Sequence, residues 1–327
     1  MSRARELPRV AISLGDPSGI GPEVTARALA RLDIRKLLRP VVFGDSRVWK
    51  RACVDAGVRD ALPRVKPGDA IPENGALVEV TRLAANQAKP GRPDLAGARA
   101  QLAFLVAATD AVEAGTCRAL CTAPLSKAQV NAAGLAFTGH TEYLANRFRR
   151  RVLMMLAGKR LRVVLATTHL PLREVPGALS TARLADDLGL IHSELKRLGV
   201  KRPSIAVCGL NPHAGEHGHL GTEDQRILAP AIARARRRGL RAAGPFPADS
   251  LFPRAVDGGF DAVFAMFHDQ GLVALKLLHF RDGVNVTLGL PFVRTSPDHG
   301  TAYDLAGTGK ADDLSMAEAL RWAARFG

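Results

Sequence analysis

Hydrophobic and polar positions follow two alternating patterns along this chain, and together they predict strands separated by helices. Short apolar runs bounded by Gly, Pro or polar residues are typical of strands that are buried on both faces of a sheet. The segment 65–93 is rich in Pro and Gly, so the run inside it is the weakest strand prediction. The runs that we interpret as strands span residues 10–14, 41–43, 77–80, 119–121, 163–166, 205–208 and 262–267.

Longer segments with a helical pattern lie between most of these strands. The first helix is expected to begin at Pro22, because Pro at the first helical position and Glu23 in the first turn are both favourable there. Alternating strands and helices are typical of a doubly wound α/β protein. The remaining helices are expected at residues 97–114, 124–134, 181–198, 223–238 and 270–278, and from 316 to the C-terminus.

The length of 327 residues exceeds what one hydrophobic core usually supports, so we expect two domains. With 47% apolar and 24% charged residues, the chain has the composition of a globular protein with a large core. Its four cysteines follow no zinc-finger or disulfide spacing, which is typical of a cytosolic protein with reduced thiols. We find no signal-peptide hydrophobic region and no apolar run long enough to span a bilayer.

The formal net charge of +15 is compatible with nucleic-acid binding, and the arginine-rich stretch 234–241 is its densest part. The other basic residues are spread along the chain, and aromatic residues make up only 5%, which leaves no platform for stacking bases. We interpret the stretch as a solvated helix end, where cations complement the helix dipole. We therefore expect no nucleic-acid partner and no membrane partner, and the positive field would favour an anionic small substrate.

Three of the predicted strands are each followed closely by a histidine. These histidines are His169, His213 and His268. Ligands bind beyond the carboxyl ends of strands in open α/β sheets, and imidazole is the commonest ligand for zinc-like ions. Three imidazoles are enough for a catalytic metal site with an open position, so the pattern indicates a single metal site.

Alternatives remain open for these histidines. A single histidine after a strand is more often a cap or a hydrogen-bonded core residue than a metal ligand. His217 and His219 lie near His213 in the same Gly-rich loop and could take its place as a ligand. Three histidines would also suit a metal-dependent hydrolase, which would need no nicotinamide.

Four further stretches carry candidate chemistry. At 15–23, glycines before a helix allow the backbone to approach an anion, although their spacing is not that of the dinucleotide fingerprint. At 137–142, Thr141 is either a helix N-cap or a ligand contact. In the stretch 283–296, Arg294 could grip a carboxylate or phosphate, or could merely pair with Asp298 on a surface loop. The stretch 298–307 is too polar and rich in turns to be core.

Together these stretches resemble the 4-hydroxythreonine-4-phosphate dehydrogenases of vitamin B6 biosynthesis. The resemblance implies an α/β fold like that of isocitrate and isopropylmalate dehydrogenases, with two α/β domains and an active-site cleft between them. The implied domains are residues 1–134 with 300–327, on the cofactor side, and residues 135–299, on the metal, substrate and dimer side. The matching segments are 15–23, 137–142, 166–173, 208–215, 221–223, 267–271 and 285–307.

The resemblance also implies roles for individual residues. It makes His169, His213 and His268 the ligands of one divalent metal ion, which would be zinc, magnesium or cobalt. It assigns the binding of a phosphorylated substrate to His140, Thr141, Lys276, Asn285 and Arg294. It assigns the binding of NAD or NADP to Gly289, His299, Gly300 and Asp304. The candidate catalytic residues are Asp249 and Asp269, for orienting ligands or the substrate amino group, and Lys276, for accepting a proton.

The implied activity is the metal-dependent oxidation of 4-phosphooxy-L-threonine by NAD(P)+. The 3-oxo acid would then lose CO2 to give 3-amino-2-oxopropyl phosphate, on the route to pyridoxal 5′-phosphate. Alternative substrates are D-erythronate 4-phosphate, D-threonate 4-phosphate or an aromatic cis-dihydrodiol. The implied assembly is a cytoplasmic homodimer with shared active sites, in which His268 comes from the partner chain.

Overall fold

The computed structural model of the protein describes residues 7–327, which form two compact units. Among these residues, the first unit comprises 7–149 and Leu290–Gly327, and the second comprises Arg150–Gly289. The family resemblance implied division points at 134/135 and 299/300 instead. With the division that the structure has, His140 and Arg294 both belong to the first unit. The two-domain α/β architecture expected from the sequence is confirmed.

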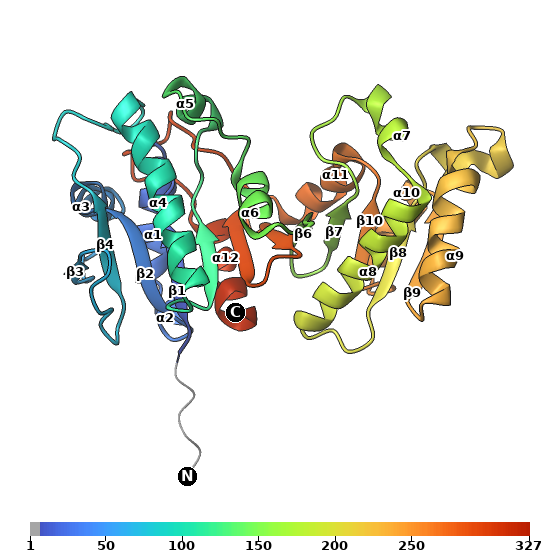
Figure 1. Cartoon of the computed structure of the whole chain (residues 1–327), viewed down its shortest axis with the longest axis horizontal. Coiled ribbons are helices and arrows are strands. Elements are labelled where there is room, and N and C mark those ends of the chain that lie inside the picture. Colours follow the sequence, from blue (N-terminus) through green and yellow to red (C-terminus); the bar gives the residue numbers. More distant parts are fainter. Residues whose placement is uncertain (1–6) are drawn as a thin grey trace, which may run out of the picture. The chain divides into compact units, whose positions relative to one another are not determined.

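The first unit contains a sheet in which every neighbouring pair of strands is parallel, with the order β3-β4-β2-β1-β5-β12 (Figure 1). The carboxyl ends of parallel strands lie at one edge, where loops that carry chemistry are expected. The strands are β1 (Arg9–Ser13), β2 (Arg39–Asp45), β3 (Arg64–Val65), β4 (Ala76–Thr81), β5 (Ala119–Thr122) and β12 (Val293–Pro297). The helices are α1 (Gly21–Ala30), α2 (Leu32–Arg35), α3 (Ser46–Asp55), α4 (Leu95–Glu113), α5 (Lys127–Ala132), α6 (His140–Phe148) and α12 (Leu314–Phe326).

Sequence signals explain where several helices of this unit begin. Pro22 lies in the first turn of α1, followed by Glu23, as the sequence predicted. Asp45 caps α3, because its carboxylate accepts hydrogen bonds from two backbone N–H groups of the first turn. Asp94 caps α4 in the same way. These caps satisfy donors that a first helical turn leaves without partners, and so they fix where each loop meets its helix.

Helix α4 is long and apolar enough to cross a membrane, judged by length and composition alone. The sequence analysis found no apolar run long enough to span a bilayer and so did not single out this helix. Half of the apolar window is buried inside the structure, and α4 packs against β1, β2 and β5. A helix that covers a sheet passes the same test, so the place of α4 in the first unit accounts for its apolar character.

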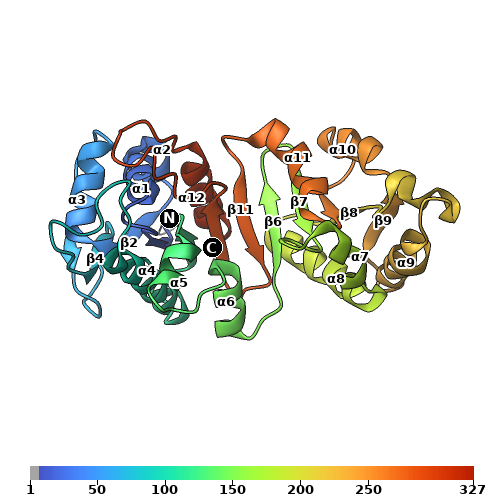
Figure 2. The same ribbon diagram turned by 90° about the horizontal axis from the view of Figure 1, so that it is seen from above.

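The second unit contains a mixed sheet with the order β11-β6-β7-β10-β8-β9 (Figure 2). The pairs β11–β6 and β6–β7 are antiparallel, whereas β7, β10, β8 and β9 are parallel. The strands are β6 (Leu153–Ala157), β7 (Arg162–Leu165), β8 (Ser204–Cys208), β9 (Arg241–Phe246), β10 (Ala262–Ala265) and β11 (Val284–Leu288). The helical segments are η1 (Leu172–Glu174), α7 (Val175–Ala178), α8 (Thr181–Arg197), η2 (Pro212–Gly218), η3 (Asp224–Leu228), α9 (Ala229–Arg237), α10 (Ala248–Val256) and α11 (His268–His279).

The core of the second unit is formed mainly by β7, β8 and β10 together with α10 and α11. Its buried members include Leu165, Cys208, Leu251, Val263 and Leu272. The three strands are almost entirely apolar because both of their faces are covered. Polar side chains are therefore confined to the strand ends, which is why the histidines after these strands stood out in the sequence.

Several elements were not predicted from the sequence, among them α3, α10, β6, β9, β11 and β12. Strands β9, β11 and β12 contain Arg241, Asn285 and Arg294 respectively, so none of them is a continuous apolar run. The helix predicted at 223–238 is a π-helical turn, η3, followed by α9.

The start of α6 corrects one interpretation of the stretch 137–142. Helix α6 begins at His140 with Gly139 as its N-cap and has no side-chain cap, so Thr141 is not the capping residue. Gly139 has a φ of +149°, and a Cβ atom there would lie 2.5 Å from the Glu142 carboxylate and 3.0 Å from the Lys127 side chain. Both neighbours are ends of flexible side chains, so it is the positive φ that favours glycine here.

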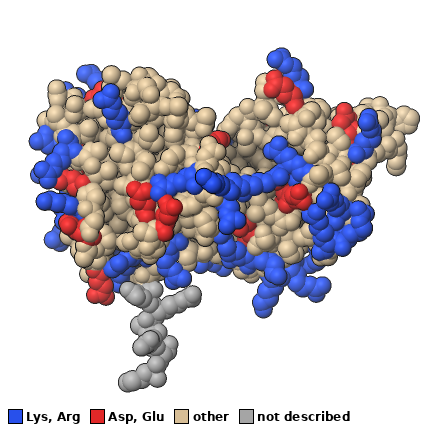
Figure 3. Space-filling view, viewed as in Figure 1, with Lys and Arg blue, Asp and Glu red and all other residues tan. Residues whose placement is uncertain are grey.

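Basic side chains are spread over the face of the molecule seen in Figure 3, with acidic side chains between them. Two arginines of the stretch 234–241 have structural contacts. Arg238 forms a 2.9 Å ion pair with Asp186, and Arg236 donates a 2.7 Å hydrogen bond to the Ala242 carbonyl oxygen. Part of this stretch therefore holds α9 to its surroundings.

Candidate active site

Three neighbouring parallel strands of the second unit end close to the three predicted histidines. Strand β10 pairs in parallel with β7 on one side and with β8 on the other. His169 follows β7, His213 follows β8, and His268 begins α11 just after β10. Because parallel strands have their carboxyl ends at one edge, the prediction that these histidines follow strands at a common edge is confirmed.

His169 and His268 are neighbours within one chain. The centroids of their imidazole rings lie 5.7 Å apart. His268 Nδ1 lies 2.7 Å from Asp269 Oδ1. In the tautomer that carries its proton on Nδ1, this nitrogen donates to the Asp269 carboxylate, and Nε2 keeps the lone pair that a metal ion requires. This is the contact that an orienting carboxylate makes in metal sites.

His213 lies in a different setting. Its side chain is 66% exposed, and its Nδ1 is 3.8 Å from Glu216 Oε2. It begins a run of five residues, 213–217, with left-handed backbone angles. Within residues 7–327, no group of three or more His, Cys, Asp or Glu side chains is close enough to hold a metal ion. The structure thus brings together two of the three predicted ligands, and His217 and His219 do not join them.

The loop that carries His213 is held by a buried carboxylate that the sequence analysis missed. Asp224 accepts hydrogen bonds from the backbone N–H of Leu210 at 2.8 Å and of Asn211 at 3.1 Å. It also accepts a 3.0 Å hydrogen bond from Asn211 Nδ2. A Cβ atom at Gly209 would lie 3.0 Å from the Asp224 carboxylate and 2.7 Å from Ala214, so the loop is closely packed here.

Gln270 joins the ends of β8 and β10. Its amide nitrogen donates a 2.6 Å hydrogen bond to the Gly209 carbonyl oxygen, and its amide oxygen accepts a 2.7 Å hydrogen bond from the Met266 N–H. The loop before His213 and the turn before His268 are therefore fixed relative to each other by one side chain. The sequence offered a signal for Gln270, because it directly follows the His268-Asp269 pair.

Arg294 lies on β12 in the first unit and is only 2% exposed. Its Nη2 donates a 2.7 Å hydrogen bond to Thr122 Oγ1 at the end of β5. Burial lowers the pKa of Arg294 to about 10, so the guanidinium still carries its charge at neutral pH. The alternative that Arg294 lies on a surface loop is therefore wrong.

His140 lies beside this buried charge. Burial of the ring lowers the pKa of His140 well below its usual value, and the positive charges of Arg294 and Lys127 lower the pKa further. The imidazole is therefore neutral at neutral pH. Its Nε2 atom is buried and has no hydrogen-bond partner among residues 7–327. A neutral imidazole, a buried guanidinium and a lysine gathered in this way suit an anionic ligand.

Lys127 was read from the sequence only as the start of a helix. It is the first residue of α5, in the loop that follows the carboxyl end of β5. Its Nζ lies near Gly139, since a Cβ atom built there would be 3.1 Å away. Its place after the strand end was the signal that could have identified it, because ligands bind at such positions.

The other predicted substrate and catalytic residues are distributed over both units. Thr141 lies in the first turn of α6, next to His140. Asn285 lies on β11, and its Oδ1 is buried without a hydrogen-bond partner among the described residues. Lys276 lies near the end of α11. Asp249, in the first turn of α10, is exposed and accepts a 2.9 Å hydrogen bond from the Ser250 N–H.

The predicted cofactor residues His299, Gly300 and Asp304 lie in the loop after β12, in the first unit. A buried network ties this loop to the turn after β1. Tyr303 donates a 2.5 Å hydrogen bond to Asp16 Oδ2, and the Ile20 N–H donates to the Thr301 carbonyl oxygen at 2.9 Å. Burial raises the pKa of Asp16, and burial together with the Asp16 hydrogen bond raises the pKa of Tyr303 to about 12.

Gly289, the fourth predicted cofactor residue, lies at the end of the second unit. It has a φ of +96°, and a Cβ atom there would lie 2.3 Å from the Arg151 carbonyl oxygen. The backbone turn alone therefore requires glycine at this position. This structural reason holds whether or not a cofactor contacts the residue.

A model of the family described as "Pyridoxal phosphate biosynthetic protein PdxA" matches residues 36–323. That range contains every histidine, lysine and arginine described above as a candidate site residue. The chain belongs to this family. The resemblance inferred from the short sequence stretches is thereby confirmed.

Individual relatives agree with the family assignment. A 4-hydroxythreonine-4-phosphate dehydrogenase of Aromatoleum aromaticum is 50% identical over 321 residues, which cover 97% of this chain and 96% of the relative. The crystal structure of a 4-hydroxythreonine-4-phosphate dehydrogenase from Klebsiella pneumoniae matches with a TM-score of 0.85 and 37% identity, covering 98% and 99% of the two chains. A terephthalate 1,2-cis-dihydrodiol dehydrogenase from Burkholderia xenovorans matches with a TM-score of 0.68 and 31% identity, covering 97% and 98%.

Proposed function

We propose that this protein is a 4-hydroxythreonine-4-phosphate dehydrogenase that oxidises 4-phosphooxy-L-threonine with NAD(P)+. The 3-oxo acid then loses CO2 to give 3-amino-2-oxopropyl phosphate. The names and the identity levels of its relatives support this proposal. One structural observation carries the proposal: Arg294, Lys127 and the neutral His140 lie together in the first unit. Two positive charges beside a hydrogen-bonding imidazole suit a phosphate.

In this proposal, Arg294 and Lys127 bind the substrate phosphate, and His140 donates a hydrogen bond to it from the buried Nε2. Neutral imidazole can donate from Nε2 when that nitrogen carries the proton. Burial strengthens these contacts, because charge-assisted hydrogen bonds are worth more where water is excluded. Thr141, Asn285 and Lys276 are the remaining substrate contacts that the family resemblance implies.

We propose His169, His213 and His268 as the ligands of one divalent metal ion, zinc, magnesium or cobalt. The neighbouring rings of His169 and His268, and the Asp269 carboxylate behind His268, suit such an ion. When bound, the ion supplies Lewis-acid chemistry that lowers the pKa of a coordinated hydroxyl. Asp249 and Asp269 orient ligands or the substrate amino group, and Lys276 is the candidate proton acceptor.

We place the nicotinamide cofactor against the loop that contains His299, Gly300 and Asp304. Its attachment to Asp16 through Tyr303 holds the loop in one conformation, which a cofactor site requires. His299 Nε2 is buried without a partner among residues 7–327 and is free to contact the cofactor. We expect the enzyme to work in the cytoplasm, which is consistent with four free and buried cysteines.

The decisive experiment is a substrate panel. We would compare 4-phosphooxy-L-threonine, D-erythronate 4-phosphate, D-threonate 4-phosphate and terephthalate cis-dihydrodiol, each with NAD+ and with NADP+. The absorbance of the reduced nicotinamide reports turnover, and a hydrolase would produce none. The highest kcat/KM is expected with 4-phosphooxy-L-threonine. A higher value with the dihydrodiol would overturn the proposal, and the Burkholderia xenovorans relative makes this the second candidate function.

We also propose a homodimer that forms through the exposed face of α11. Val273, Leu277 and Phe280 follow one another at helical spacing and are 60%, 83% and 76% exposed. Such an apolar row on a helix marks an interface. His268 begins the same helix, but helical spacing places it on the side away from this row. The family resemblance implies that the partner subunit supplies His268.

Mixing two inactive variants tests whether the site is shared. Neither His213→Ala nor His268→Ala alone should retain metal or activity. If the partner supplies His268, a heterodimer of the two variants has one intact site and should regain metal and activity. If one chain supplies all three ligands, as the adjacent rings of His169 and His268 would also permit, exchange of subunits restores nothing. His217→Ala serves as the matched control.

A further inference from the structure

The first unit contains a cavity that the proposed reaction does not use. Its volume is about 360 Å³, within the range of about 300–1,000 Å³ that small-molecule sites occupy. It lies among α1, α2, α3 and the first residues of β2, Arg39 and Pro40. These residues are at the amino end of β2, whereas Lys127 and the turn after β1 follow carboxyl ends of strands parallel to β2. The cavity and the proposed phosphate site therefore lie at opposite edges of one sheet.

The inner wall of this cavity is apolar and partly aromatic. Leu29, Ile34, Trp49 and Leu62 line it. The Trp49 indole is fixed in place, because its Nε1 donates a 3.0 Å hydrogen bond to Asp60 Oδ1. A flat, rigid aromatic surface of this kind favours a ligand with a planar apolar body.

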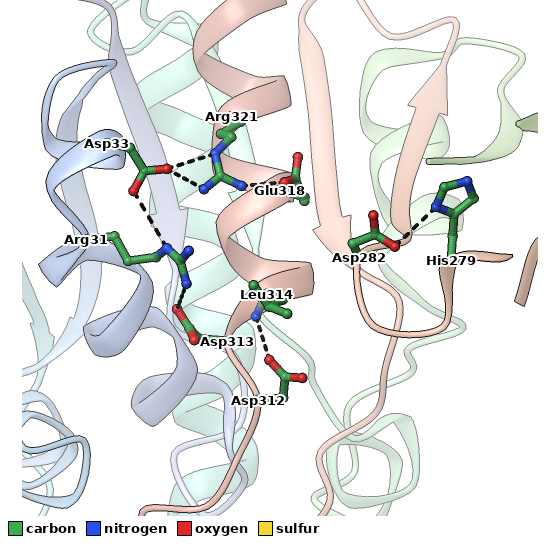
Figure 4. Close-up of polar contacts among 9 residues, drawn as sticks. All are labelled: Arg31, Asp33, His279, Asp282, Asp312, Asp313, Leu314, Glu318 and Arg321. Carbon is green, nitrogen blue, oxygen red and sulfur yellow. Dashed lines mark hydrogen bonds and ion pairs between the residues drawn. The ribbon is translucent and has the colours of Figure 1, made fainter. Parts of the chain in front are cut away.

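The rim of the cavity is positively charged. Arg35, Arg39 and Arg59 line it, and none of the three side chains has a hydrogen bond or ion pair among residues 7–327. The nearby carboxylates have other partners. Asp33 on α2 pairs with Arg31 and Arg321 (Figure 4), and Asp60 pairs with Arg64. Within the described part of the chain, three guanidinium groups without an ion-pair partner thus line this largely apolar cavity.

We propose that this cavity is a binding site for a small phosphorylated aromatic molecule. Guanidinium groups bind phosphate through paired, charge-assisted hydrogen bonds, and three of them suit a dianion. The aromatic body of the ligand would contact Trp49 and the aliphatic wall. Neither the substrate phosphate nor the metal is involved, so this inference stands independently of the proposed reaction.

The chain provides its own reporter for a test. It has two tryptophans, Trp49 in the cavity wall and Trp322 on α12. Trp322→Phe leaves Trp49 as the only indole, and phenyl phosphate serves as an unreactive probe. We expect a saturable change of Trp49 fluorescence on titration with phenyl phosphate. Inorganic phosphate alone should bind at least about tenfold more weakly, because it cannot fill the apolar part.

Matched variants in the Trp322→Phe protein separate this cavity from other anion sites. The double variant Arg39→Gln/Arg59→Gln should weaken the binding of phenyl phosphate by about tenfold or more, since each substitution removes a charged contact. Arg99→Gln, which changes an exposed arginine of α4 outside the cavity, should have no effect. Ala61→Leu enlarges a side chain at the exposed rim of the cavity without a change of charge and should also reduce the fluorescence change.

Two results would overturn the proposal. One is the absence of any saturable change in Trp49 fluorescence while circular dichroism shows a folded protein. The other is an equal change in the Arg39→Gln/Arg59→Gln variant or in the Ala61→Leu variant, which would mean that the probe binds elsewhere. If the double arginine variant does not fold, the Ala61→Leu variant decides alone.

Discussion

Replacing Arg294 by methionine should separate stability from activity. Arg294→Met keeps a long side chain in the buried position on β12 but removes the charge. Burying a guanidinium is costly, and an apolar side chain of similar volume is often neutral or stabilising in its place. The loss of the 2.7 Å hydrogen bond to Thr122 costs only about 1 kcal/mol. We therefore expect the Tm to stay the same or to rise.

The same substitution should lower kcat/KM strongly, although it does not lower the Tm. If Arg294 binds the substrate phosphate, its removal leaves substrate oxygens without a charged partner, which costs about 2–4 kcal/mol in kcat/KM. At about 1.36 kcal/mol for each factor of ten, this corresponds to a loss of roughly 30- to 900-fold. The pKa of His140 should also rise, because the Arg294 charge is one of the causes that lower it.

The assay compares two substrates in two enzymes. Wild type and Arg294→Met would each be given 4-phosphooxy-L-threonine and its dephosphorylated form, 4-hydroxy-L-threonine. The variant should lose kcat/KM with the phosphorylated substrate and change little with the other. Arg82→Gln, which removes an arginine whose side chain is 77% exposed on the loop after β4, is the matched control. Equal losses with both substrates would refute the phosphate-binding role, and a large fall in Tm would refute the stability argument.

Three further predictions concern residues that position or complete the site. His140 has a lowered pKa in the folded protein, so the free energy of unfolding should decrease as the pH falls below about 6.5, by up to about 1.4 kcal/mol per pH unit. The Tm of His140→Gln should therefore fall less steeply below pH 6.5 than the Tm of wild type. The control His217→Gln, which changes an exposed histidine, should match wild type. Asp224→Ala should weaken metal retention during dialysis against a chelator by about tenfold or more, and unchanged metal content would show that the His213 loop needs no such support. Tyr303→Phe should raise the KM for NAD(P)+ with little change in the KM for the phosphorylated substrate, and the reverse pattern would move the cofactor away from this loop.

Much of the fold could be predicted from the sequence because buried parallel strands are apolar over their whole length. Strands β1, β5, β7, β8 and β10 were recognised for this reason, and polar residues just beyond their ends stood out as candidates. Strand β12 was missed because Arg294 interrupts its pattern. Arg294 therefore prevented the recognition of β12, and it is also the residue that best supports a phosphate site. An apolar side chain at this buried position would stabilise the fold at least as well, so a structural role alone does not explain an arginine here.

The supporting contacts could not be predicted, since they join residues that are far apart in the sequence. Asp16 and Tyr303 are 287 positions apart, and Gln270 contacts the carbonyl of Gly209 from 61 positions away. Lys127 joins the proposed phosphate site only because α5 and α6 lie close together around Gly139. Spacing within a motif carries information about local structure, but such contacts depend on how the strands are ordered in the sheet.

The backbone around His213 is the clearest case in which local sequence preference and structure disagree. His213, Ala214, Glu216 and His217 all have positive φ angles, between 40° and 56°, although none of them is glycine. Left-handed conformations cost roughly 1–2 kcal/mol for each such residue, so this loop is strained unless other contacts offset the cost. The buried Asp224 carboxylate supplies such contacts at the start of the loop, through the N–H groups of two residues. Backbone strain of this kind is found where a loop serves a function. The loop keeps His213 exposed at the carboxyl edge of the sheet, which is where ligands bind. A purely structural role of His213 would not explain the strain.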